Sequence, residues 1–296
     1  MHFSALHASE PAMVRPLSLA EHVLYADLLE QGVDDLFDPD LPENGSILIR
    51  PNRASAQSAH AYYQGYRPAA GYERRGQRFA RYLGRADDPE VVARIARFQR
   101  VKAVRAERVT TVRALIGAGM PRPDRMTGRI IEALARAGLF PGHAVLIGEA
   151  AYQTYDGVLG VRLAKPPKAT TSDRPTLEII VRDGRHLAKL MHALRAVDPS
   201  FTAELADTAS YRSATGIRVA VTISDRVNDP TKDQISSLIT NPVESLVLYG
   251  PGIPVTVPAP ERFVVHAQIT RSTHTAMIAS LIEALRTSRS GYRDVR

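Results

Sequence analysis

The sequence predicts a mixed α/β (α+β) fold in which helices flank a mixed sheet. Three short apolar runs have the length and β-branched content of buried strands, namely His143–Ile147, Thr176–Val181 and Arg218–Ile223. Helical periodicity occurs in between, over Arg125–Ala137 and His186–Val197. Short strands that alternate with helices are typical of a sheet covered by helices.

The residues before this core predict a helix, a β-hairpin and a long helix. A first helix is expected over Leu17–Gln31, with Ser18 as its N-cap. Strands are expected over residues 46–50 and 61–67, with a third over residues 77–83. Asp88 and Pro89 are suited to open the long helix, because proline at the first helical position loses no hydrogen bond. We therefore divide the chain into an N-terminal accessory region, residues 1–120, and a core with C-terminal helices, residues 121–296.

The composition excludes several classes of site. Hydrophobic residues make up 44% and charged residues 23%, as in ordinary soluble globular proteins. The chain has no cysteine, which excludes disulfides, thiolate metal sites and cysteine nucleophiles and fits a cytoplasmic protein. No stretch has the pattern of a signal peptide or the length of a membrane span, so no membrane partner is expected. The net charge of +7 fits a polyanionic partner or a basic solvated surface equally well.

Several short motifs follow the first core strand in a fixed order. They are Val145-Leu146-Ile147-Gly148, Ala151-Tyr152, Tyr155, Leu159-Gly160-Val161-Arg162-Leu163 and Thr171-Ser172-Asp173. In this order and spacing they resemble bacterial nucleotidyltransferase-fold proteins, a distant branch of the superfamily that contains DNA polymerase beta. Further matches upstream and downstream extend the resemblance over most of the chain. The resemblance implies a nucleotidyltransferase-type mixed sheet.

The resemblance also implies a metal-dependent reaction that needs three carboxylates. Two acids on alternate residues of a strand point the same way, and a third on a neighbouring strand completes the metal cage. Asp173 matches the first acid, but Pro175 and Ala220 stand at the other two positions. Asp173 is therefore the one expected catalytic residue and metal ligand, and Mg²⁺ is expected only if the protein is active. A turn residue in a Thr-Ser-Asp-Arg-Pro loop is the alternative interpretation of Asp173.

Four other acids could replace the missing ones, namely Glu149, Glu178, Asp183 and Asp225. Glu178 lies five residues after Asp173, so on an unbroken strand it would face the opposite side. Glu149 follows the glycine where the family has a small hydroxyl residue, and its charge would repel a triphosphate.

The same resemblance places a nucleotide pocket around the turn after the first core strand. The expected nucleotide-binding residues are Gly148, Glu149, Arg162, Lys165 and Lys168. Arg162 matches the family's arginine near the nucleotide. The two lysines lie in a proline-rich loop, and a solvated basic loop explains them equally well.

One face of the long helix is a candidate nucleic-acid surface. It carries Arg94, Arg97, Lys102, Arg105 and Arg108. Residues eleven apart are about three helical turns apart, so these cations form a stripe that can follow a phosphate backbone. The tyrosine- and arginine-rich residues before the helix could stack on bases. The alternative is the solvated face of an amphipathic helix.

Three functional hypotheses follow. The first is a nucleotidyltransferase relative with an incomplete carboxylate set, which binds nucleotide, nucleic acid or a protein with weak or no catalysis. The second is an active, divergent nucleotidyltransferase that moves a nucleoside monophosphate to a protein, an RNA or a small molecule. The third is an interaction module for nucleic acid or protein.

Overall fold

The computed structural model describes residues 14–31, 41, 43–52, 55–67, 77–140, 142–165, 176–204, 209–225, 231–270 and 275–291. The chain forms two compact units. The core unit comprises Met1–Gly32 and Thr111–Arg296, and the inserted unit comprises Val33–Thr110. These units are defined by contacts, so the division into domains at residue 120 stays a prediction.

The core unit is built on a five-stranded mixed sheet in the order β5-β7-β10-β9-β8. The strands are β5 (Ala144–Ile147), β7 (Thr176–Val181), β8 (Thr202–Glu204), β9 (Ala209–Arg212) and β10 (Arg218–Ile223). Strands β7 and β10 run parallel, whereas the other neighbours are antiparallel. The predicted α+β class and the three predicted core strands are thus confirmed.

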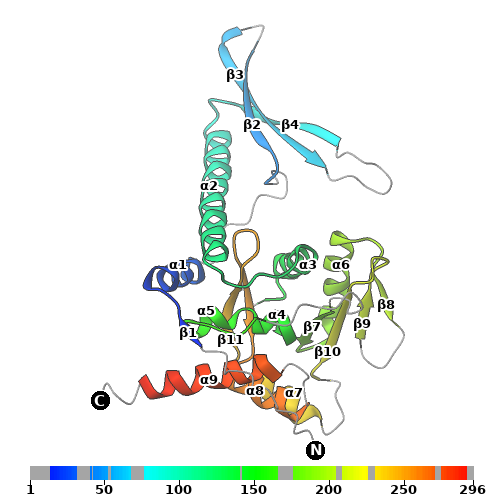
Figure 1. The fold of residues 1–296 in the computed structure, drawn as a ribbon. Helices are drawn as coiled ribbons and strands as arrows, with labels where there is room; N and C mark the ends of the chain where they lie inside the picture. The colour runs from blue at the N-terminus through cyan, green and yellow to red at the C-terminus, as the bar shows by residue number, and fades with distance from the viewer. Residues whose placement is uncertain are drawn as a thin grey trace, which may run out of the picture. The chain divides into compact units, whose positions relative to one another are not determined.

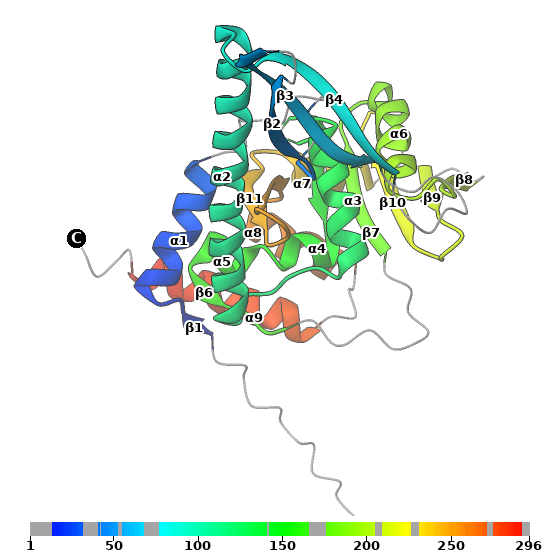
Figure 2. The same cartoon turned by 90° about the horizontal axis from the view of Figure 1, so that it is seen from above.

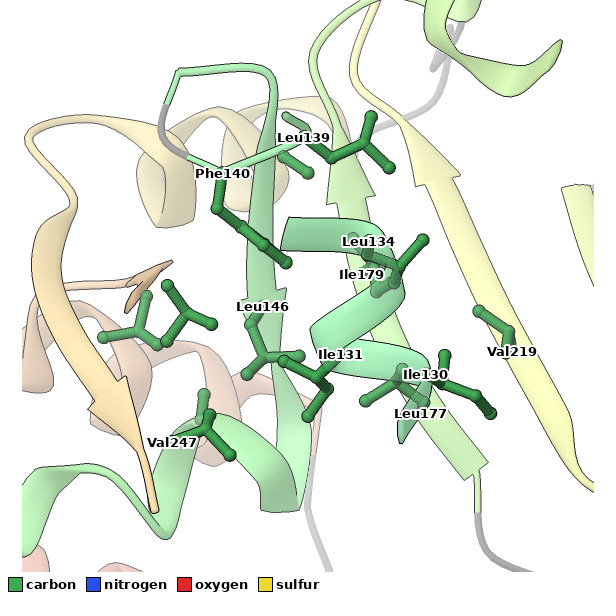
Figure 3. Close-up of a cluster of buried hydrophobic side chains, with 14 of the residues drawn as sticks. Ile130, Ile131, Leu134, Leu139, Phe140, Leu146, Leu177, Ile179, Val219 and Val247 are labelled. Carbon is green, nitrogen blue, oxygen red and sulfur yellow. The ribbon is translucent and has the colours of Figure 1, made fainter. Parts of the chain in front are cut away.

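One face of this sheet is covered by α3 (Arg125–Arg136) and α6 (Leu187–Val197), which lie side by side in Figures 1 and 2. Asp124 starts α3 because its Oδ1 accepts the backbone N–H groups of Met126 at 2.8 Å and Thr127 at 3.1 Å. Figure 3 shows the resulting core between α3 and the strands, made by Ile130, Ile131, Leu134, Leu146, Leu177, Ile179 and Val219. Apolar burial on this scale holds the sheet and its two helices together.

The opposite face of the sheet is apolar at one end only. There, Val145 and Ile180 pack with Leu238 of α7 (Thr231–Ile239). Toward the start of β7 the same face carries polar side chains. This difference leaves a polar area beside the turn that follows β5.

The remaining elements of the core unit surround the sheet. They are β1 (Arg15–Pro16), α1 (Leu19–Glu30), α4 (Gly148–Tyr152), α5 (Tyr155–Leu159), β6 (Val161–Arg162), the 3-10 helix η1 (Gly184–His186), β11 (Val243–Val247), β12 (Ile253–Val257), α8 (Pro260–Ile269) and α9 (Thr275–Gly291). Ser18 caps α1 as predicted, in a capping box with Glu21. Tyr25 of α1 reaches β11, where its hydroxyl lies 2.9 Å from Ser245 Oγ. No helix in the described ranges is long and apolar enough to cross a bilayer.

The inserted unit is a three-stranded antiparallel sheet in the order β2-β3-β4 (Figure 1). Its elements are β2 (Ser46–Asn52), β3 (Ser55–Arg67), β4 (Gln77–Arg85) and the first part of α2 (Pro89–Gly117). Asp88 opens α2 as predicted, because its Oδ1 accepts the Glu90 N–H at 2.9 Å. Tyr63 is fully buried, and its ring meets the edge of Phe98 of α2 at 5.8 Å between centroids. The predicted hairpin, third strand and long helix are confirmed.

Candidate functional site

The turn after β5 is shaped by a glycine that lies against an acidic side chain. Gly148 has a φ of 65°, a backbone conformation that residues with a side chain rarely adopt. A Cβ atom at this position would lie 2.5 Å from Glu178 Oε2 and 3.1 Å from its Cδ. Any other residue would therefore strain the backbone and push Glu178 away. The backbone of the turn and the carboxylate of Glu178 are in close contact.

Glu178 lies at the centre of the polar area of the sheet. In the register it pairs with Ala220 of β10 on one side and with Ile147 of β5 on the other. Because side chains alternate along a strand, Thr176, Glu178 and Ala220 share one face. Thr176 and Glu178 are exposed, whereas Leu177 between them is buried. We call this surface the polar face, which includes Thr176, Glu178, Ala220 and their neighbours Ser210, Arg212, Arg218 and Glu204.

The far part of the polar face is an ion-pair network around Glu204. Its carboxylate accepts a hydrogen bond from Ser210 Oγ at 2.6 Å and pairs with Arg212 and with Arg218, the latter at 3.3 Å. The hydrogen bonds from Ser210 and Arg212 lower the pKa of Glu204. Glu204 is thus held as a counterion. The two arginine side chains stay about 40% exposed.

The polar face has the layout of a three-carboxylate metal site but not its residues. Two alternate positions of β7 and one position of β10 converge beside a glycine turn, and only Glu178 among them is an acid. Within the described ranges, no three Asp, Glu, His or Cys side chains lie close enough to hold a metal ion. One carboxylate is too few to hold a pair of divalent cations, because each cation needs several oxygen ligands.

Comparison with known proteins gives the family. A family model described as Nucleotidyltransferase matches residues 125–277, which is just over half of the chain. This chain belongs to that nucleotidyltransferase family. No curated protein matches the sequence, and no solved structure matches it. The matched segment contains β5, the Gly148 turn, β7 and β10, so the polar face lies within the family domain.

The family's expected first acid falls where the structure gives no placement. Asp173 and Lys168 lie outside the described residues. Strand β7 begins at Thr176, so the acid that faces the Gly148 turn is Glu178. Sequence reasoning gave Glu178 little weight because it counted the alternation from Asp173. The signal that could have found it is the strand itself, since Glu178 is the acid inside the apolar run Thr176–Val181.

Arg162 has partners inside the core unit. It forms an ion pair with Glu21 of α1, and its Nη2 donates to the carbonyl oxygen of Ala118 at 2.7 Å. Strand β6, which carries it, pairs with β1 and not with the five-stranded sheet. The structure thus gives Arg162 a role in holding α1. Nucleotide binding by Arg162 stays a prediction.

Two further expected nucleotide contacts, Glu149 and Lys165, are exposed. Glu149 accepts a hydrogen bond from Gln153 Nε2 at 3.0 Å, one turn along α4. Lys165 is exposed after β6. Among the expected residues that the structure describes, Gly148 lies against Glu178 of the polar face.

Sequence reasoning missed a buried carboxyl group in the family domain. Asp156 of α5 is 4% exposed and accepts the Leu163 N–H at 3.2 Å. Burial raises the pKa of Asp156 to about 7, against smaller opposing effects of the Leu163 hydrogen bond, Arg162 and Lys165. In the sequence, Asp156 looks like an ordinary polar residue of a short helix.

The cations of the long helix α2 are in different surroundings. Lys102 Nζ donates to the Gly45 carbonyl at 2.7 Å, and Arg105 pairs with Glu43 at 2.7 Å. Arg108 is buried, and burial together with Arg105 lowers its pKa. Arg94 is half-buried and Arg97 exposed. Lys102 and Arg105 therefore tie α2 to the loop before β2, and nucleic-acid binding by this stripe stays a prediction.

Proposed function

We propose that this nucleotidyltransferase-family protein binds a nucleoside triphosphate on the polar face, with weak or no nucleotidyl transfer. The observation that carries the proposal is the register of β7 and β10, in which Glu178 is the one acid of the three converging positions. Thr176 and Ala220 occupy the other two. The polar face would thus offer a surface to the triphosphate while lacking most of the negative charge that holds metal ions.

The charges of the polar face favour binding over catalysis. Arg212 and Arg218 lie on neighbouring strands and remain partly exposed, so they can attract phosphate oxygens. Glu178 would contact a Mg²⁺ ion that the triphosphate brings with it, since Mg²⁺ is often held by one or two carboxylates plus phosphates. Transfer depends on clamping both the attacking and the leaving oxygen with two metal ions, and one carboxylate is too few for that.

Thermal unfolding and turnover, measured on the same samples, test this proposal. We expect ATP or GTP with Mg²⁺ to raise the Tm by several degrees, because a ligand at about 100 times its Kd stabilises by about 2.7 kcal/mol. Glu178→Gln should reduce that shift. Glu244→Gln is the matched control, because Glu244 is an exposed strand glutamate of β11, in another sheet.

The turnover measurement distinguishes the proposal from an active enzyme. With γ-labelled nucleoside triphosphate and Mg²⁺, we expect little or no release of labelled pyrophosphate above the background without protein. Sustained release of pyrophosphate that the Asp173→Ala variant abolishes would contradict the proposal. It would establish an active nucleotidyltransferase with Asp173 as a metal ligand. If nucleotide neither binds nor turns over, the family domain acts as a scaffold and the proposal is wrong.

A further inference from the structure

We propose that the outer face of the inserted unit's sheet binds single-stranded nucleic acid. The outer face is the side of β2, β3 and β4 that carries Arg50, His60, Tyr62, Tyr66, Arg78 and Tyr82. The proposal concerns residues outside the segment matched by the family and does not depend on nucleotide binding by the core unit.

The two faces of this sheet have opposite characters. The inner face is the core of the inserted unit, where Tyr63, Phe79 and Phe98 pack together. Gly45 and Gly65 leave room for the Tyr63 ring, since a Cβ on either would lie less than 3 Å from it. Because neighbours along a strand point to opposite faces, Tyr62 on β3 lies on the outer face. The outer face therefore carries aromatic rings that the fold itself does not need to bury.

Three rings of the outer face, those of His60, Tyr62 and Tyr82, form a connected cluster. Tyr62 and Tyr82, which pair across β3 and β4, have their centroids 5.4 Å apart. His60 lies 5.7 Å from Tyr82 between centroids, and its Nδ1 is 3.0 Å from the Tyr82 hydroxyl. Tyr82 and Tyr66 are 55% and 53% exposed. Large rings that are held in place with open faces match the stacking platforms that bind unpaired bases.

The charge around the rings selects a polyanion. The Arg50 guanidinium lies 5.8 Å from the Tyr62 centroid, and Arg78 pairs in register with Tyr66. Residues 41–110 contain 14 arginines and lysines against six aspartates and glutamates. Phosphates can meet these cations while bases lie on the rings. A duplex offers the phosphates but keeps its bases stacked inside, so the combination fits a single strand.

Fluorescence anisotropy with the full chain tests the proposal. The probes are a fluorescein-labelled 12-nucleotide mixed-sequence RNA, the DNA of the same sequence and the corresponding duplex. We expect both single strands to bind at low salt and the duplex to bind much more weakly. The RNA and DNA probes show which sugar is preferred. Replacing Arg50 and Arg78 by glutamine should flatten the salt dependence by roughly 0.7 per lost phosphate contact.

Paired substitutions separate ring stacking from general charge. Tyr66→Thr with Tyr82→Thr keeps β-propensity but removes two rings, so we expect binding to be weaker by about 30-fold or more. Tyr66→Phe with Tyr82→Phe keeps the rings and should bind within about threefold of the parent chain. Ile49→Thr is the control, because Ile49 is an exposed β2 residue that precedes Arg50 and therefore alternates to the other face. Circular dichroism and thermal unfolding check that each variant is folded.

Three results would overturn the proposal. These are no binding of either single strand, equal affinity of the threonine variant and the parent chain, and duplex binding as tight as that of the single strands. Sedimentation of the protein without nucleic acid measures its oligomeric state and can also overturn the proposal. A dimer that dissociates in the threonine variant would assign the outer face to a second copy of the chain.

Discussion

Asp156 is a carboxyl group that the fold keeps away from water. Its pKa is about 7 in the folded chain, against the ordinary value of 3.8. Between pH 3.8 and about pH 7, Asp156 binds more protons in the folded state than in the unfolded state. The free energy of unfolding therefore falls as pH rises through this range. The effect is complete above the folded pKa, where the buried group is charged in both states. The core unit is therefore more stable when Asp156 is protonated than when it is charged.

The prediction at the residue scale is that Asp156→Asn removes this part of the pH dependence. The asparagine amide is neutral at every pH and its oxygen can still accept the Leu163 N–H. Denaturant unfolding at pH 5, 6, 7 and 8 should show the variant gaining on the parent by up to about 1.4 kcal/mol per pH unit through the range below 7. Asp27→Asn, an exposed aspartate of α1, is the control. Parallel curves for the parent and Asp156→Asn would contradict the burial effect.

At the element scale, the central feature is the pairing of β7 with β10. Parallel neighbours lie about 4.8 Å apart and alternate residues of one strand about 6.6 Å apart. The positions of Thr176, Glu178 and Ala220 are therefore close enough for three carboxylates to share metal ions. Of these three positions, only that of Glu178 carries a carboxylate.

The register predicts that two substitutions can create a metal-binding site on the polar face. Thr176→Asp together with Ala220→Asp should create a site for Mn²⁺ or Mg²⁺, because three carboxylates then converge beside Gly148. In EDTA the double variant should unfold at a lower temperature than the parent, since three like charges repel. Adding Mn²⁺ should raise its Tm by several degrees and leave the parent nearly unchanged. Thr202→Asp with Thr215→Asp adds the same charge away from Glu178 and should not respond to the metal. A double variant that ignores Mn²⁺ would show that these positions do not converge as the register indicates.

The elements were more predictable than the site, for physical reasons. Strands such as Thr176–Val181 can be predicted from their short apolar runs. Helix α3 can be predicted from the Asp124 cap and the periodic apolar face. The orientation of Glu178 depends on where β7 begins. The sequence alone does not fix that point, because Pro175 directly precedes the strand. The partners of Arg162 and Lys102 are distant in the chain, at Glu21 and Gly45. No local pattern encodes such contacts.

At the scale of the whole molecule, two compact units carry two different candidate surfaces. The family domain provides the polar face, with one acid among its three converging positions and two partly exposed arginines. The inserted unit provides tyrosine rings and arginines on a separate sheet. Each surface is built from contacts within its own unit. Binding on one should therefore leave the local stability of the other unit unchanged.

Hydrogen exchange read by mass spectrometry tests this independence. A triphosphate with Mg²⁺ should slow exchange in β7 and β10, and a single-stranded oligonucleotide should slow exchange in β2, β3 and β4. At about 100 times the Kd, the slowing should approach 100-fold for amides that exchange through opening of the bound region. Glu178→Gln should weaken the first footprint alone, and Tyr66→Thr with Tyr82→Thr should weaken the second alone. Protection of β7 and β10 by the oligonucleotide would instead mean that nucleic acid occupies the polar face itself, in which case Glu178→Gln would change its affinity and the tyrosine variant would not.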